Sequence, residues 1–259
     1  MYGRPIRTVR PVLFVIAHGS RDPRHAATVR ALVRRVREQR PGLRVETGFL
    51  DFNSPSVPEV LESLDAEGVR DVIALPLLLT RAFHAKSDIP AALSQAPPRL
   101  RIRQAGVLGP SPLLLNALDQ RLYEAGLTPA DKSSTGVVLA SAGSSDPEAI
   151  AVIAEIAREW RHTGWCAVRP AFASASLPRT EDAVRELRDL GVGRVAVAPY
   201  VIAPGFLPDR IARGAADADV TAEVLGSSDG LARLLVRRYD EACSESGVVG
   251  RMARVPVLA

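Results

Sequence analysis

Apolar residues along this chain form two kinds of segment, which alternate from one end to the other. Short apolar runs without polar alternation, such as VLFVIA at 12–17, are typical of strands buried on both faces of a parallel sheet. Longer segments between them have helical spacing, as at Leu32 and Val36 in residues 23–40. Asp22, followed by proline, is a good N-cap for that helix. Alternating strands and helices predict a doubly wound parallel α/β sheet.

The same reasoning extends along the whole chain. We expect strands at residues 11–17, 44–50, 71–79, 100–106, 136–141, 166–172, 194–202 and 220–226. We expect helices at residues 23–40, 57–68, 88–96, 111–126, 147–161, 181–191, 207–216 and 230–242.

The second half of the pattern repeats the first. Residues 45–79 align with 168–202 without a gap, and HGSRDP at 18–23 matches AGSSDP at 142–147. A repeat of this length indicates duplication of a whole domain. We therefore predict two tandem domains of the same doubly wound fold, 1–127 and 136–245, with a cleft between them. The polar, turn-rich stretch Gly126 to Gly136 is the predicted linker.

Three side chains of the first half follow three successive predicted strands. They are His18, Asp51 and His84. In open α/β sheets ligands bind beyond the carboxyl ends of the strands, so these groups are expected at one rim. Two imidazoles and a carboxylate favour a divalent-metal site for iron(II), cobalt(II), nickel(II) or zinc(II). A lone histidine after a strand is more often a capping or hydrogen-bonded group, so the prediction depends on all three residues together.

The second half does not repeat this set. Ala142, Ser174 and Leu207 stand at or near the places of the histidine, aspartate and histidine. The first half therefore carries the metal-binding side chains, and the second half only lines the cleft. This is expected if a single bound molecule occupies one cleft between the two domains. The remaining histidines, His25 and His162, we assign to structure or solvent.

Composition narrows the class of protein. The 259 residues are 47% hydrophobic and 24% charged, which is typical of a globular chain. No apolar run approaches the ~20 residues of a membrane helix, and the start lacks the apolar core of a signal peptide, so we expect a cytoplasmic protein. Two cysteines, Cys166 and Cys243, are too few for a disulfide framework.

The charge balance indicates the kind of partner. A net charge of +4 fits nucleic acid, an anionic membrane or an acidic small molecule. Aromatic residues make up only 5% of the chain, and the arginines are not interleaved with them, which argues against stacking on single-stranded nucleic acid.

The motifs resemble those of the sirohydrochlorin chelatase family. The resemblance is carried by AHGSRDP at 17–23, FLD at 49–51, PLLL at 76–79 with HAKSDIP at 84–90, and a degenerate second half with PGFLPDRI at 204–211. It implies an enzyme that inserts Fe²⁺ or Co²⁺ into sirohydrochlorin, for siroheme or cobalamin synthesis. It also implies that His18 and His84 bind the metal. Our hypothesis is that one of these two histidines accepts the pyrrole protons, and the sequence does not indicate which one. Asp51 stands where the family usually has glutamate.

The implied substrate agrees with the basic charge. Sirohydrochlorin is flat and polyanionic, so it requires a wide cleft with cationic groups at the rim. The candidate substrate-binding residues beside the motifs are Ser20, Arg21, Arg24, Arg81, Lys86 and Arg210. The metal is a substrate, and no prosthetic group is implied.

Two other functions compete with this interpretation. A non-catalytic carrier of tetrapyrrole or metal would use the same cleft, and a nucleic-acid-associated regulator would use the positive charge. We expect neither nucleic-acid nor membrane binding. A duplicated chain can form in one molecule the cleft that a shorter relative would build from two, which favours a monomer.

Overall fold

The computed structural model describes residues 10–80 and 87–252, except the side chains of 246–252. Its first half contains β1 (Val12–Ala17), α1 (Pro23–Gln39), β2 (Val45–Phe49), α2 (Val57–Ala66), β3 (Asp71–Pro76), α4 (Asp88–Ser94), β4 (Arg101–Gln104) and α5 (Pro112–Glu124). Its second half contains the 3₁₀ helix η1 (Pro129–Ser134), β5 (Thr135–Ser141), α6 (Pro147–Arg161), β6 (Ala167–Phe172), α7 (Thr180–Asp189), β7 (Arg194–Tyr200), α8 (Phe206–Gly214), β8 (Val220–Thr221) and α9 (Asp229–Met252).

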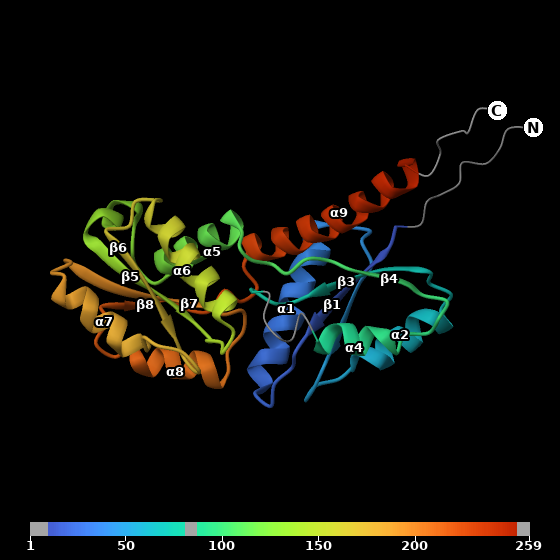
Figure 1. The fold of residues 1–259 in the computed structure, drawn as a ribbon, viewed down its shortest axis with the longest axis horizontal. Helices are drawn as coiled ribbons and strands as arrows, with labels where there is room; N and C mark the ends of the chain where they lie inside the picture. Colours follow the sequence, from blue (N-terminus) through green and yellow to red (C-terminus); the bar gives the residue numbers. More distant parts are fainter. Residues whose placement is uncertain (1–9, 81–86, 253–259) are drawn as a thin grey trace, which may run out of the picture.

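The strands form two parallel four-stranded sheets with the same topology (Figure 1). Their orders are β2-β1-β3-β4 and β6-β5-β7-β8, so the first strand of each half is central. Every residue of β1 is buried, and alternate residues face opposite layers. Leu13 and Val15 pack in the cluster that contains α1, whereas Phe14 and Ile16 pack against α2. Helices therefore cover both faces of the sheet, and the predicted fold class is confirmed.

The largest differences in length from the sequence prediction are in β8 and α9. β8 comprises only Val220 and Thr221, where a longer strand was expected, and its register with β7 extends over two residue pairs. α9 continues to Met252, about ten residues beyond its expected end. None of the helices in the described part of the chain is long and apolar enough to cross a membrane.

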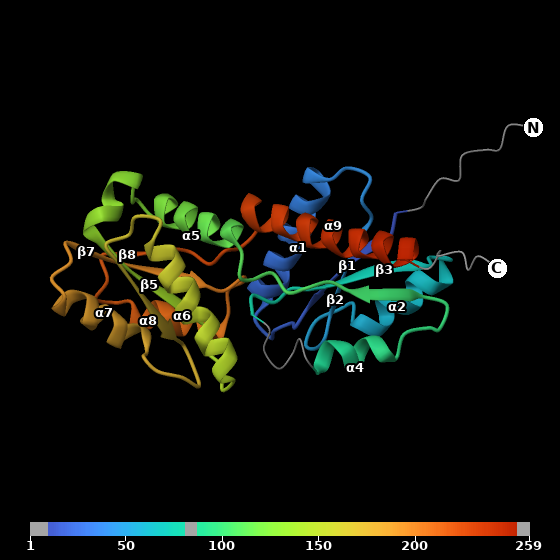
Figure 2. The same ribbon diagram turned by 45° about the horizontal axis from the view of Figure 1, so that its top comes forward.

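The last helix of each half packs on the sheet of the other half. α5 contacts β7 of the second sheet, and α9 contacts α1 and β3 of the first (Figures 1 and 2). Tyr239 Oη of α9 donates a hydrogen bond to Pro11 O at 2.8 Å, and Arg238 Nε donates to Val107 O at 2.9 Å. We call the first sheet with α1, α2, α4 and α9 the N-terminal lobe. The second sheet with α5, α6, α7 and α8 is the C-terminal lobe.

One carboxylate fixes α5 to the C-terminal lobe. Asp119 Oδ1 accepts hydrogen bonds from Trp160 Nε1 at 2.8 Å and from Trp165 Nε1 at 3.0 Å. Its other oxygen pairs with Lys132 of η1. Both indoles are buried, so this single side chain satisfies donors that have no access to water.

Asp119→Ala is therefore expected to destabilise the protein by about 3 kcal/mol, because two buried indole N–H groups and an ammonium lose their acceptor. Urea unfolding followed by tryptophan fluorescence measures the effect, since the chain has only these two tryptophans. The exposed Asp189, at the end of α7, gives the control variant Asp189→Ala. Equal stability of the two variants would contradict the anchoring role of Asp119.

Candidate functional site

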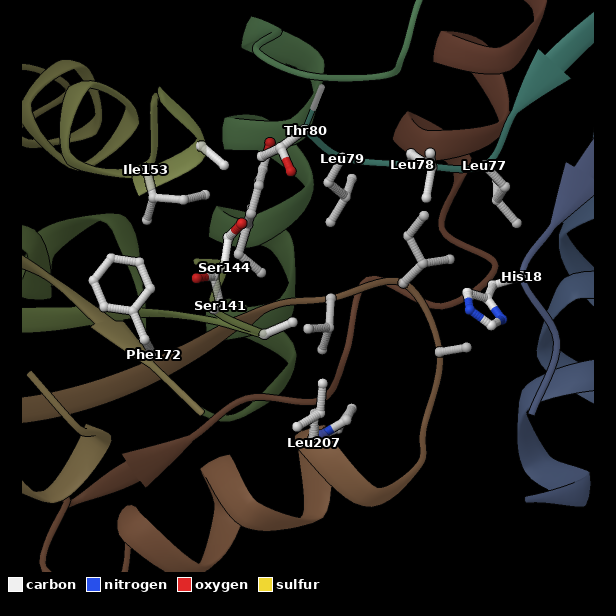
Figure 3. A pocket seen from close by; sticks show the side chains of 18 of the residues that line it. His18, Leu77, Leu78, Leu79, Thr80, Ser141, Ser144, Ile153, Phe172 and Leu207 are labelled. Atoms are coloured by element: carbon white, nitrogen blue, oxygen red, sulfur yellow. The ribbon is translucent and has the colours of Figure 1, made fainter. Parts of the chain in front are cut away.

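A cavity of about 410 Å³ lies between the two lobes, at the carboxyl ends of the central strands (Figure 3). The N-terminal lobe lines it with residues that follow β1 and β3, including His18 and Leu77 to Thr80. The C-terminal lobe contributes residues that follow β5 and β7, together with apolar side chains such as Ile153 and Phe172. The lining is mostly apolar, so the few polar side chains in it are the candidates for binding and chemistry.

His18 enters this cavity from the end of β1. The loop that carries it packs tightly against the loop after β2, since Asp51 N donates to His18 O at 2.9 Å. Gly19 makes the close approach possible, because its φ is +96° and a Cβ there would lie 1.8 Å from Asp51 O. Figure 3 shows the imidazole at one end of the cavity, away from the hydroxyl groups of Ser141 and Ser144.

Asp51 is adjacent to His18 through the backbone, but its side chain points elsewhere. It is exposed, and its Oδ1 accepts a hydrogen bond from Phe52 N at 2.8 Å. Asp51 is not among the described residues that line the cavity. His84, Arg81 and Lys86 lie outside the described residues. Within the described ranges, no three His, Cys, Asp or Glu side chains are close enough together to hold a metal ion.

A second imidazole, His25, lines the same cavity, which the sequence analysis did not predict. It belongs to the first turn of α1. Burial and the nearby His18 lower the pKa of His25 below its usual value, against a smaller opposing effect of Asp22. Its buried Nδ1 has no hydrogen-bond partner among the described residues. The sequence repeat could have indicated this role for His25. In the alignment of the two halves, both histidines that line the cavity correspond to alanine in the second half.

The predicted cationic rim is partly engaged within the protein. Arg21 is exposed, with its guanidinium carbon 5.1 Å from the centre of the Phe52 ring. Arg210 is exposed on α8. Ser20 stabilises its own loop: its Oγ accepts from the Asp22 amide at 3.1 Å, and its amide donates to Asn53 at 2.8 Å.

Arg24 joins the two lobes. Its Nη2 lies 2.6 Å from Asp22 Oδ2 in its own lobe and 2.7 Å from Asp209 Oδ2 at the start of α8. The guanidinium holds the pKa of the Asp22 carboxyl below its usual value. The neighbours of this bridge in sequence, His25 and Pro208, line the cavity from opposite lobes. An ion pair between Arg24 and Asp209 therefore connects the two lobes beside the cavity.

Comparison with known proteins gives consistent matches over both lobes. The family model CbiX matches residues 12–125 and, a second time, 136–242. A sirohydrochlorin cobaltochelatase of Priestia megaterium is 32% identical over 211 residues, covering 78% of this chain and 67% of that protein. A sirohydrochlorin ferrochelatase of the same organism is 28% identical over 247 residues, covering 91% of each.

Solved structures agree on the fold. The structure of SirB from Bacillus subtilis with Fe³⁺ has a TM-score of 0.79 at 23% identity, covering 92% of this chain and 98% of that one. CbiX, described as the terminal enzyme for biosynthesis of siroheme in denitrifying bacteria, has a TM-score of 0.65 at 20% identity, covering 90% and 99%. At these identities the likeness shows the shared two-lobed fold.

Proposed function

Because this chain belongs to the CbiX family, we propose that it is a sirohydrochlorin chelatase, which inserts a divalent metal ion into sirohydrochlorin. Relatives of similar identity are named for cobalt and for iron, so Co²⁺ and Fe²⁺ are the proposed metal substrates. The observation that carries the proposal is the asymmetric cavity. His18 lines it from one lobe, while its counterpart in the other lobe, Ala142, lines it with a methyl group.

We propose that His18, His84 and Asp51 hold the metal ion before insertion. Imidazole nitrogen suits both Fe²⁺ and Co²⁺, and a site without cysteine leaves positions open for transfer. Because Oδ1 of Asp51 accepts the Phe52 amide, Oδ2 is the oxygen that would bind the metal ion, directly or through water.

The size of the cavity favours partial insertion of the ring. Its volume of about 410 Å³ lies in the lower half of the range for drug-sized ligands, roughly 300–1,000 Å³. A tetrapyrrole with acidic side chains is larger than such ligands. We therefore propose that the metal-facing part of the ring enters the cavity while its carboxylates meet cationic groups at the rim. The proposed rim residues are Ser20, Arg21, Arg24, Arg81, Lys86 and Arg210.

Other features of the protein stay predictions from its sequence. Residues 1–127 and 136–245 are the proposed duplicated units, whose last helices are exchanged in the packed lobes. We propose a monomer acting in the cytoplasm, with the metal as substrate and no prosthetic group. Neither nucleic acid nor a membrane is a proposed partner.

An anaerobic assay with sirohydrochlorin and Fe²⁺, Co²⁺ or Ni²⁺ tests the function, followed by the absorbance change on metal insertion. An enzyme will convert many ring molecules per protein, and the order of kcat/KM will identify the preferred metal. A carrier of tetrapyrrole or metal would stop after one equivalent. Stoichiometric loading with all three metals would contradict the proposal.

Asp209→Asn is expected to lower the KM for sirohydrochlorin two- to five-fold. The aspartate competes with substrate carboxylates for Arg24, and an exposed ion pair of this kind contributes little to stability. Stability should therefore change little. Asp217→Asn, at an exposed aspartate after α8, is the matched control. An increased KM in Asp209→Asn would show that the ion pair assists binding.

A further inference from the structure

The cavity holds one imidazole that the proposed metal site does not use. We propose that His25 accepts the pyrrole protons that the metal ion displaces. This inference rests on the proposed chelatase function and assigns one of its chemical steps. It stands on the position of His25, on the difference between the two lobes, and on the requirements of the reaction.

The N-terminal cap of α1 sets the position of His25. The Asp22 carboxylate accepts a hydrogen bond from Arg24 N at 2.9 Å, and Asp22 O accepts one from His25 N at 3.1 Å. These bonds fix the first helical turn and direct the imidazole to the cavity that His18 also lines. Nδ1 of His25 is buried and has no partner among the described residues, so we assign the proton acceptor to the other ring nitrogen, Nε2.

The duplicated lobe shows that packing alone does not require this imidazole. Asp22 corresponds to Asp146, which caps α6 in the same way, with Glu148 N donating to its Oδ1 at 3.0 Å. His25 then corresponds to Ala149, which also lines the cavity. The same capped turn thus packs with a methyl group in one lobe and with a half-buried imidazole in the other. Burying a polar ring without a partner is unfavourable, which indicates a function for it.

The reaction needs a proton acceptor separate from the metal ligands. Each pyrrole N–H bond breaks, its electron pair forms the nitrogen–metal bond, and the proton leaves. An imidazole nitrogen that binds the metal cannot accept that proton at the same time. His25 receives the first proton, releases it to solvent and then receives the second. Burial keeps His25 neutral near pH 7, in the form that accepts a proton.

Two titratable groups change the tendency of His25 to take up a proton. His18 from the end of β1 disfavours its protonation, and Asp22 from its own helix cap favours it. On the facing lobe, α8 presents Leu207 and Pro208 to the same cavity, and its Asp209 is paired with Arg24.

His25→Gln tests the assignment in the full chain. We expect kcat for Co²⁺ insertion to fall about 10²- to 10⁴-fold, the usual contribution of a general base. Binding of Co²⁺ alone and of metal-free sirohydrochlorin should stay within three-fold of the wild type, as measured by titration calorimetry and by fluorescence. His162→Gln is the control, because His162 is the exposed C-cap of α6.

A second variant separates a base from a structural residue. His25→Ala should regain part of its activity when imidazole is added to the assay, and His18→Ala should not. Wild-type kcat in His25→Gln would overturn the inference, and so would loss of Co²⁺ binding, which would make His25 a ligand. Failure of the wild-type protein itself to turn over would instead contradict the proposed function.

Discussion

Replacing His18 by alanine is expected to abolish metal insertion and leave the fold intact. His18 is a proposed ligand that lines the cavity, and loss of residues that merely support a ligand typically costs 10- to 100-fold. Loss of the ligand itself should therefore lower kcat/KM by more than about 100-fold. The fold should tolerate the change, because Ala142 occupies the equivalent position of the C-terminal lobe.

The same loss is expected for His84→Ala, at the other proposed ligand. Anaerobic Co²⁺ insertion measures activity, and calorimetry measures Co²⁺ binding to each variant without the ring. Both variants should bind Co²⁺ weakly and melt at the wild-type temperature, while His162→Ala should behave as wild type. Normal insertion by either variant would remove that histidine from the site.

The central strands were predictable because their environment is simple. A strand covered by helices on both faces has no polar side, so VLFVIA is apolar throughout and every one of its residues is buried. The start of α1 was equally predictable, since Asp22 and Pro23 act through local backbone chemistry. These features depend on neighbours in sequence and on burial alone.

The exchange of α5 and α9 was not predictable from the same pattern. Periodicity shows that a helix has an apolar face, and either sheet offers a surface for it. The choice depends on contacts such as Tyr239 with Pro11, which join residues 228 positions apart. The short β8 was not predictable either, because the apolar pattern continues to residue 226 while the chain leaves the sheet after Thr221.

The candidate site was predictable where the topology determined it. His18 and Asp51 follow adjacent strands, and their backbones are indeed hydrogen-bonded. The side-chain direction of Asp51 was not predictable, because it depends on a local bond to the next amide. His25 was assigned to structure or solvent on its helical position alone, although the direction of a helix relative to the facing lobe decides whether its first turn meets a cavity. The pairing of Arg24 with Asp209 required the same knowledge of both lobes.

Gly19→Ala is expected to destabilise the protein by about 4–5 kcal/mol, a range reached only when a substitution disrupts tight packing. The φ of +96° is unfavourable for alanine, and the new Cβ would lie 1.8 Å from Asp51 O. The clash is with backbone, so the loops after β1 and β2 must separate. That movement breaks the bond from Asp51 N to His18 O and displaces the histidine, so Co²⁺ binding should fall as well.

Gly42→Ala separates the two causes. Gly42 also has a positive φ, of +83°, but a Cβ there meets no heavy atom within 4 Å. It should cost only about 1–2 kcal/mol, the penalty of the backbone conformation, and leave Co²⁺ binding unchanged. Urea unfolding and calorimetry on both variants measure the difference. If Gly19→Ala and Gly42→Ala lower the free energy of unfolding equally, contact between the loops after β1 and β2 does not hold His18 in place. The position of His18 must then depend on the helices that pack behind it.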